Sequence, residues 1–230
     1  MSGQLLSVSF ASRKGNEVGN VTINTCIVAG WTGRDQVALE KHIVELEALG
    51  VKRPATTPVF YRVGYSRLTT SDTIEVVGES SSGEVEYVLL QHGGKLWVGV
   101  GSDHTDREVE TYGVTVSKQI CDKPVAPTFW PIEEVEAHWD SLTLRSFITV
   151  DGKKSLYQEG KLSGMLAPRN VISRFVGDKE LLEGAVMFCG TFGAIGGIRP
   201  APRFDFEIED PILGRKIQHG YDTVSLPIAG

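Results

Sequence analysis

Apolar and polar residues alternate along most of the chain with a period of two, which is the pattern of half-buried β-strands. Several alternating segments are joined by short turns, such as Gly93-Gly94 and Asp151-Gly152, and this arrangement predicts antiparallel hairpins. The pattern therefore predicts a β-rich α+β fold that opens with a hairpin around residues 13–16. Strands are expected at residues 5–10, 21–29, 59–63, 73–77, 85–89, 95–100, 142–150, 155–160, 185–189 and 204–208.

One segment has the helical period instead. Asp35 is a suitable N-cap, apolar residues recur at helical spacing after it, and Gly50 ends the run, so we expect a helix over residues 36–49. His42 and Glu45 stand three residues apart on this helix and share one face, where they can share a hydrogen bond or a water. The alternative is an ordinary histidine and glutamate on a surface helix.

Shorter segments give less regular patterns. A short helix is expected at residues 169–175, after Pro168. Residues 107–117 are expected to form a helix that turns into a strand, with Gly113 weakening the helix. Residues 132–139, which follow a proline-rich loop, are expected to form a short helix or strand.

The predicted hairpin at residues 83–108 carries candidate chemistry. Glu84 and Glu86 are two residues apart, so on a strand both carboxylates project from one face. The returning strand would deliver Asp103 close to them. Like charges that are set close together repel, and a shared divalent cation such as Mg²⁺ or Mn²⁺ would relieve the repulsion. The alternative, that both glutamates line the solvent face of an edge strand, stays open from spacing alone.

A glycine-rich loop follows the apolar strand expected at residues 185–189. Gly190 begins this loop, and its backbone N–H groups can approach an anionic ligand closely, with Thr191 adding a hydroxyl. The loop lacks the lysine and the following helix of a nucleotide-binding fingerprint, and such loops also occur as plain turns.

Composition limits the class of protein. The 230 residues are enough for one large domain, and we expect a single core over residues 1–230, with a hairpin region at 1–34. A net charge of −6 with scattered basic residues argues against nucleic-acid and anionic-membrane partners. No apolar run has the length of a signal peptide or a membrane span. Cys26, Cys121 and Cys189 are widely spaced, which favours reduced thiols in a cytoplasmic protein over disulfides or a zinc site.

The order of these motifs resembles that of the fumarylacetoacetate hydrolase superfamily. HIVE at residues 42–45 resembles the family's H-x-x-E element, and GEVEYVLL at 83–90 resembles its E-x-E-L metal-binding strand. SDHTDRE at 102–108 is similar to N-D-x-S-x-R-D, and Lys118 with the proline-rich loop after it is similar to K-S-x-D-x-x-x-P-x-G-P. EGAVMFCGTFGAIGG and FDFEIEDPILG resemble the family's glycine-rich loop and its tail. The similar elements span residues 35–225 in the family's order.

The resemblance implies a mixed β-sheet roll with few helices, a homodimer, and a site that acts on a small 2-oxo or 1,3-diketo acid. It implies Mg²⁺ or Mn²⁺ bound by Glu84, Glu86 and Asp103, and C–C bond hydrolysis through a metal-stabilised enolate. The implied catalytic residues are His42, Glu45 and Lys118, with His42 and Glu45 activating a water. The implied substrate-binding residues are Arg34, Gly190 and Thr191.

The chain also departs from the family pattern, chiefly around the expected substrate. Position 62 is Arg where the family often has Lys, and Phe192 replaces a common Pro. One enolate can also serve a decarboxylase, a 2-oxo-alkenoate hydratase or a tautomerase, so these reactions remain alternatives. A non-catalytic metabolite-binding protein with the same fold is the alternative from another class.

Overall fold

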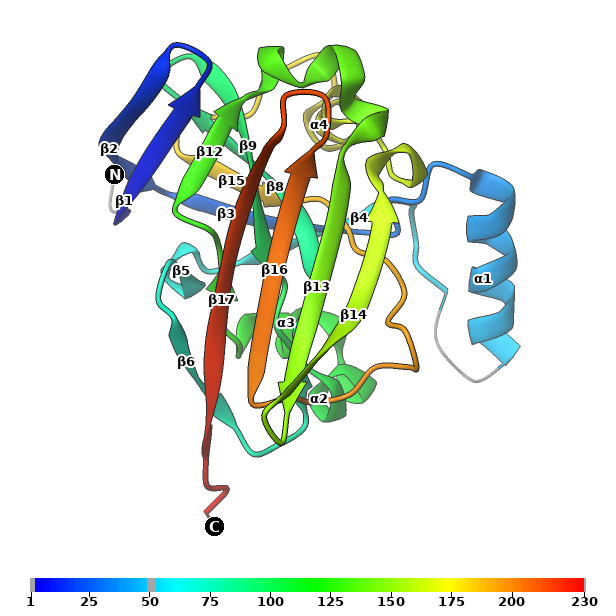
Figure 1. Ribbon diagram of the computed structural model, residues 1–230. Coiled ribbons are helices and arrows are strands. Elements are labelled where there is room, and N and C mark those ends of the chain that lie inside the picture. The colour runs from blue at the N-terminus through cyan, green and yellow to red at the C-terminus, as the bar shows by residue number, and fades with distance from the viewer. Residues whose placement is uncertain (1–2, 49–52, 230) are drawn as a thin grey trace.

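The structure is a computed structural model that describes residues 3–48 and 53–229. In the helix α1 (Gln36–Ala48) the backbone is described, but the side chains of Ala38, His42, Glu45, Leu46 and Ala48 lie outside the described part. In the described residues, the strands form one sheet of eight, one sheet of five and two short two-stranded ladders. The five-stranded sheet lies in front of the eight-stranded sheet in Figure 1, and α1 stands apart at one side.

The eight-stranded sheet contains the central hairpin. Strands β8 and β9 pair antiparallel from Val85↔Ser102 to His92↔Lys95, so the hairpin predicted around Gly93-Gly94 is confirmed. Two pairs in this sheet, β1 with β12 and β15 with β3, are parallel. The strands, in spatial order, are β2 (Gly15–Ile23), β1 (Gln4–Ser12), β12 (Thr128–Pro131), β9 (Lys95–Ser102), β8 (Val85–His92), β15 (Ala185–Phe188), β3 (Thr25–Gly30) and β4 (Val59–Val63).

The five-stranded sheet is built mostly from the C-terminal part of the chain. Its strands are antiparallel except for β17 and β6, which pair in parallel. Phe204 and Phe206 are buried while Asp205 between them is partly exposed, as the alternation in the sequence predicted. The strands, in spatial order, are β14 (Lys153–Lys161), β13 (Thr143–Val150), β16 (Arg203–Asp210), β17 (Arg215–Leu226) and β6 (Thr73–Val77).

Strand β8 is buried on both faces, and its glutamate, Glu86, lies on one of them. Tyr87 and Leu89 belong to the apolar layer between the two sheets, together with residues of β13 and β16. Val88 and Leu90 belong to a second apolar cluster with residues of β1 and β12. Because side chains alternate across a strand, Glu86 shares the face of Val88 and Leu90 and points away from the layer between the sheets.

The helix predicted over residues 36–49 is confirmed as α1, apart from Leu49, which lies outside the described residues. At the start of this helix the Val37 N–H donates to Asp35 Oδ1 at 2.9 Å. The expected helix at residues 169–175 is confirmed as α4. Residues 132–134 and 136–139 lie in the 3₁₀ helices η2 and η3, and Val135 is the turn between them. None of the helices in residues 3–48 and 53–229 has the length and apolar character needed to cross a membrane. The remaining elements are α2 (Arg107–Tyr112), α3 (Val114–Gln119), α4 (Pro168–Val176), η1 (Tyr65–Arg67), η2 (Ile132–Glu134), η3 (Glu136–Ser141), η4 (Leu162–Gly164), β5 (Leu68–Thr69), β7 (Ser81–Ser82), β10 (Thr105–Asp106) and β11 (Lys123–Pro124).

Two sequence-based predictions of elements were wrong. The segment 107–117 forms the helices α2 and α3 rather than a helix followed by a strand; Gly113, with extended backbone at φ −176°, separates them. The strand expected over 21–29 is two strands that divide at Asn24. The hairpin turn consists of Arg13 and Lys14 alone, whereas residues 13–16 were expected. Strand β2 therefore begins at Gly15 and ends at Ile23, inside the strand predicted over 21–29.

Candidate metal centre

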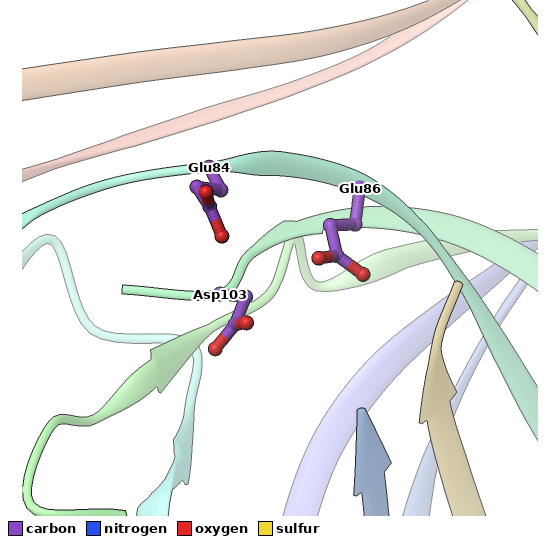
Figure 2. Close-up of side chains that lie close together, drawn as sticks. All are labelled: Glu84, Glu86 and Asp103. Carbon is purple, nitrogen blue, oxygen red and sulfur yellow. The ribbon is translucent and has the colours of Figure 1, made fainter. Parts of the chain in front are cut away.

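Three carboxylates meet where the β8–β9 hairpin opens. Glu84 directly precedes β8, Glu86 is its second residue, and Asp103 directly follows β9. The Asp103 N–H donates to the Glu84 carbonyl oxygen at 2.9 Å, which holds the two chain segments together. Each residue offers a carboxylate oxygen within 4.8 Å of the other two, and Figure 2 shows the three side chains facing a common space. The prediction that the hairpin brings Asp103 to the paired glutamates is confirmed.

The cluster is largely removed from water. Glu86 is 2 % exposed and Asp103 is fully buried, whereas Glu84 is partly exposed. Burial raises the pKa of Glu86 well above its usual value, the Asp103 charge raises it further, and Lys118 opposes both. Burial also acts to raise the pKa of Asp103, but the ammonium groups of Lys118 and Lys123 outweigh it and lower that pKa. The ammonium groups of Lys118 and Lys123 therefore favour the charged form of Asp103, whereas burial favours the protonated form of Glu86.

Lys118, the catalytic lysine implied by the resemblance, reaches this cluster from α3. Its Nζ donates to Asp103 Oδ2 and lies 3.9 Å from Glu84 Oε2. The ammonium also lies 5.8 Å from the centre of the Tyr61 ring, a cation–π distance. Burial acts to lower the pKa of Lys118, but Asp103 and Glu84 raise it above its usual value, so the side chain carries a positive charge.

Two more cations belong to the cluster, and the sequence did not predict either. Arg107 Nη2 lies 3.2 Å from Glu84 Oε1, and Lys123 Nζ lies 3.2 Å from Asp103 Oδ1. Arg107 falls within the motif at 102–108, so its spacing could have identified it. No sequence signal identified Lys123, because only the tertiary pairing of its strand places it beside Asp103.

Gly101 explains how Lys123 reaches the hairpin. Strand β11 lies against β9 through an isolated bridge between Gly101 and Val125. A Cβ atom on Gly101 would lie 2.8 Å from the Pro124 carbonyl oxygen, so a glycine is needed for the two backbones to approach this closely. The close approach brings Lys123, at the start of β11, into contact with Asp103.

The glycine-rich loop borders the cluster, and the two groups predicted to bind substrate, the Gly190 N–H and the Thr191 hydroxyl, already have partners within the chain. The Gly190 N–H donates to Glu86 Oε2 at 2.6 Å. Thr191 Oγ1 donates to the Val85 carbonyl oxygen at 2.8 Å and accepts a hydrogen bond from Gln158 at 2.8 Å. Their predicted contact with a substrate carboxylate therefore stays a prediction. Gln158 comes from the other sheet, and no sequence signal identified it.

The remaining predicted residues come from the start and the body of α1. Arg34 makes a two-pronged ion pair with Asp140, at 2.9 and 2.7 Å, and its Nε donates to the Met165 carbonyl oxygen. Among the described contacts, none links Arg34 to the three carboxylates. The side chains of His42 and Glu45 lie outside the described residues, so their catalytic roles stay predictions.

The donor set fits a hard divalent cation. All three candidate ligands are carboxylates, which are donors that Mg²⁺ and Mn²⁺ prefer over softer nitrogen or sulfur groups. Two of the three are buried: Asp103 contacts Lys118 and Lys123, whereas Glu86 has no ion pair among the described residues, so its charge would be costly without a cation. Glu84, Glu86 and Asp103 would hold such an ion.

Comparison with solved structures identifies the fold. A fumarylacetoacetate hydrolase family protein from Yersinia pestis CO92 matches with a TM-score of 0.63 and 17% identity, over 94% of this chain and 100% of that one. A 2-hydroxyhepta-2,4-diene-1,7-dioate isomerase from Mycobacterium marinum matches with a TM-score of 0.62 and 13% identity, over 96% and 99%. A 2-keto-3-deoxyarabinonate dehydratase matches with a TM-score of 0.64 and 16% identity, over 89% and 75%. The β-rich fold is therefore that of the fumarylacetoacetate hydrolase superfamily, as the motif order predicted.

Comparison with protein families gives the closer assignment. The chain belongs to the family described as "Protein of unknown function (DUF2848)", whose sequence profile matches residues 29–221. A search of curated proteins found no significant match. The matched range contains all three carboxylates and all three cations of the candidate metal centre.

Proposed function

We propose that the chain is a Mg²⁺- or Mn²⁺-dependent hydrolase that cleaves a C–C bond in an acylpyruvate or a related 1,3-diketo or 2-oxo acid. The observation that supports this most directly is the convergence of Glu84, Glu86 and Asp103 beside Lys118. Carboxylates alone would suit many cation sites. A buried, charged lysine at the same place adds a group that can stabilise negative charge on a substrate.

The roles of the described residues follow from their positions. When bound, a divalent cation would polarise the keto oxygen and stabilise the enolate that leaves when the C–C bond breaks. Glu84, Glu86 and Asp103 hold the cation. Lys118 is the ammonium group nearest the partly exposed Glu84, and it supplies positive charge to an oxyanion that develops there.

Hydrolysis also needs an activated water. His42, oriented by Glu45, takes a proton from the water as it attacks the distal carbonyl carbon, a role that suits an imidazole near neutral pH. The C–C bond then breaks, and the electron pair passes to the enolate carbon, which is protonated. The products are a carboxylic acid and the shorter 2-oxo acid. Arg34, Gly190 and Thr191 are the proposed contacts of the substrate carboxylate.

A second reaction type is favoured by the solved structures. The proteins of the same fold include one named as an isomerase and one named as a dehydratase. Both reactions can proceed through an enolate next to a carboxylate, and neither breaks a C–C bond. A decarboxylase, hydratase or tautomerase on the same centre is therefore the alternative to hydrolysis.

One assay separates these reactions. Metal-stripped protein is supplied with Mg²⁺ or Mn²⁺ and incubated with acylpyruvates, oxaloacetate and 2-oxo-4-enoates, and the products are followed by proton NMR. Hydrolysis releases pyruvate and a second acid, decarboxylation releases CO₂, hydration adds a hydroxyl, and tautomerisation changes neither mass nor carbon count. Metal-dependent release of pyruvate from an acylpyruvate is the expected result. Binding of these acids without any turnover would contradict the proposal and favour a metabolite-binding protein.

A further inference from the structure

Each carboxylate of the centre has one oxygen in contact with a donor other than Lys118, which itself donates to Asp103 Oδ2 and approaches Glu84 Oε2. The three contacts are Arg107 Nη2 to Glu84 Oε1 at 3.2 Å, the Gly190 N–H to Glu86 Oε2 at 2.6 Å, and Lys123 Nζ to Asp103 Oδ1 at 3.2 Å. The donors come from three separate segments of the chain: the start of α2, the glycine-rich loop and β11.

Lys123 is the most firmly fixed of the three donors. Its side chain is fully buried, and besides Asp103 its Nζ contacts the carbonyl oxygens of His104 at 2.5 Å and Cys121 at 3.2 Å. The two carbonyl oxygens accept two of the three N–H groups of the ammonium, which has no acceptor to offer. The Asp103 contact is an ion pair without the alignment of a hydrogen bond. Because Lys123 is enclosed, it acts on Asp103 and has no path to a substrate, so it is a positioning residue.

Lys118 shows which oxygen of Asp103 faces the other carboxylates. Lys118 contacts Asp103 Oδ2 and also lies 3.9 Å from Glu84 Oε2, so Oδ2 is the Asp103 oxygen on the side of Lys118 and Glu84. Lys123 holds the opposite oxygen, Oδ1. A carboxylate oxygen has two acceptor positions, so Oδ2 can serve Lys118 and a cation together.

We propose that Lys123 makes Asp103 a one-oxygen ligand and thereby sets a preference of the centre for Mg²⁺ over Ca²⁺. The inference rests on the proposed metal dependence and adds a determinant of metal specificity. Ca²⁺ takes six to eight oxygens and often binds both oxygens of a carboxylate, whereas Mg²⁺ takes six and uses few carboxylates. Oδ1 lies against the fully buried Lys123, so a cation beside Lys118 meets Oδ2, and Asp103 does not supply the second oxygen that favours the larger ion. Arg107 and the Gly190 N–H restrict the two glutamates in the same way.

The test compares the affinities of Mg²⁺ and Ca²⁺, measured separately by titration calorimetry on metal-stripped protein. The variant Lys123→Met removes the ammonium and keeps the length of the side chain. Loss of one positive charge strengthens the binding of both divalent ions alike, so the ratio of the two affinities isolates the number of oxygens that Asp103 offers. The matched control is Lys154→Met, which breaks a 3.0 Å ion pair with Asp205 on the second sheet.

The wild type is expected to prefer Mg²⁺, and in Lys123→Met the Mg²⁺-to-Ca²⁺ affinity ratio should fall by about tenfold. The control should keep the wild-type ratio. An unchanged ratio in a folded Lys123→Met protein, or a wild type that binds Ca²⁺ as tightly as Mg²⁺, overturns the inference. A wild type that binds neither ion overturns the proposed metal dependence itself.

The buried lysine is a risk for folding, so circular dichroism accompanies each titration and Lys123→Gln serves as a second variant. An infrared measurement on the wild type does not depend on a Lys123 variant. The splitting of the carboxylate stretching bands on adding Mg²⁺ or Ca²⁺ distinguishes one-oxygen from two-oxygen binding. Bands of one-oxygen binding are expected with both ions. The band of the Asp103 carboxylate is identified by its loss in Asp103→Asn. If that band has the splitting of two-oxygen binding, the inference is overturned.

Discussion

The backbone N–H of Gly190 donates a 2.6 Å hydrogen bond to Oε2 of Glu86, so the glycine-rich loop is tied directly to a candidate metal ligand. Gly190 has a φ of +98°, which side chains other than glycine rarely allow. A Cβ atom at this position would also overlap the hydroxyl of Thr32, which itself donates to the Cys189 carbonyl oxygen at 2.9 Å. The loop therefore orients Glu86 through a backbone conformation that requires glycine.

The first prediction concerns this glycine. Gly190→Ala should lower the free energy of unfolding by at least about 2 kcal/mol, because it combines an unfavourable backbone angle with a steric overlap. It should also weaken Mn²⁺ binding, since the hydrogen bond to Glu86 depends on the same backbone. Denaturant unfolding and calorimetry measure the two effects. Gly193→Ala is the control: a Cβ there has no atom within 4 Å and the change should be nearly neutral.

Gln158 links the second sheet to the candidate metal centre. This buried side chain accepts from the Val85 N–H at 3.0 Å and donates to Thr191 Oγ1 at 2.8 Å and to the Phe192 carbonyl oxygen at 2.6 Å. Gln158→Leu should cost about 2 kcal/mol of unfolding free energy, because it leaves buried polar groups without a partner. Hydrogen exchange should speed up at Val85. An equal loss in Gln218→Leu, at an exposed glutamine, would contradict this account.

Asp210 gives a prediction for acid stability. Burial acts to raise its pKa, but the Leu213 N–H, His138 and Arg215 outweigh it and lower the pKa below the usual value of about 3.9. The folded protein thus binds this proton more weakly than the unfolded chain. The stabilisation is complete above the unfolded pKa and is lost as the pH falls through the folded one.

Asp210→Asn should therefore be about 2 kcal/mol less stable than the wild type at pH 7, with a smaller difference below pH 4. Denaturant unfolding at a series of pH values measures this difference. The exposed Asp178→Asn variant should follow the wild type throughout. A difference for Asp210→Asn that stays constant from pH 7 to pH 3 would show that its charge is not the cause.

The proposed water-activating role of His42 predicts a separation between turnover and metal binding. His42→Ala should lower kcat for acylpyruvate hydrolysis by at least about 100-fold, as loss of a general base does, and leave Mn²⁺ affinity unchanged. Lys41→Ala, at the neighbouring exposed position of α1, is the control for general effects on the helix. Turnover that survives in His42→Ala would remove this role and favour an enolate reaction that uses no attacking water.

Features that depend on local sequence could be predicted from the chain alone. Gly93-Gly94 between two apolar runs defines the hairpin, and the period of two puts Glu84 and Glu86 on one face of it. Asp103 comes directly after the returning strand, so the length of that strand places it beside the two glutamates. For these residues a single turn and a single register determine the positions.

Features that depend on long-range pairing could not be predicted. Lys123 reaches Asp103 only because β11 pairs with β5 and because Gly101 admits the Pro124 backbone, and neither contact leaves a periodic pattern in the sequence. Valine and threonine in residues 114–116 favour a strand intrinsically, yet the segment forms α3, where packing places Lys118 in the cluster. Tertiary contacts overrode local preference at the point where the chain assembles its candidate metal centre.

The most direct test of the metal centre is a calorimetric titration of metal-stripped protein with Mg²⁺ and Mn²⁺, with and without oxalate as a mimic of a 2-oxo acid enolate. Glu86→Gln is compared with the wild type because it keeps the size of the side chain and removes its charge. We expect the wild type to bind one ion per chain, more tightly with oxalate, and Glu86→Gln to bind at least about tenfold more weakly. Wild-type protein that binds neither ion under either condition would contradict the central claim, and the fold alone would remain.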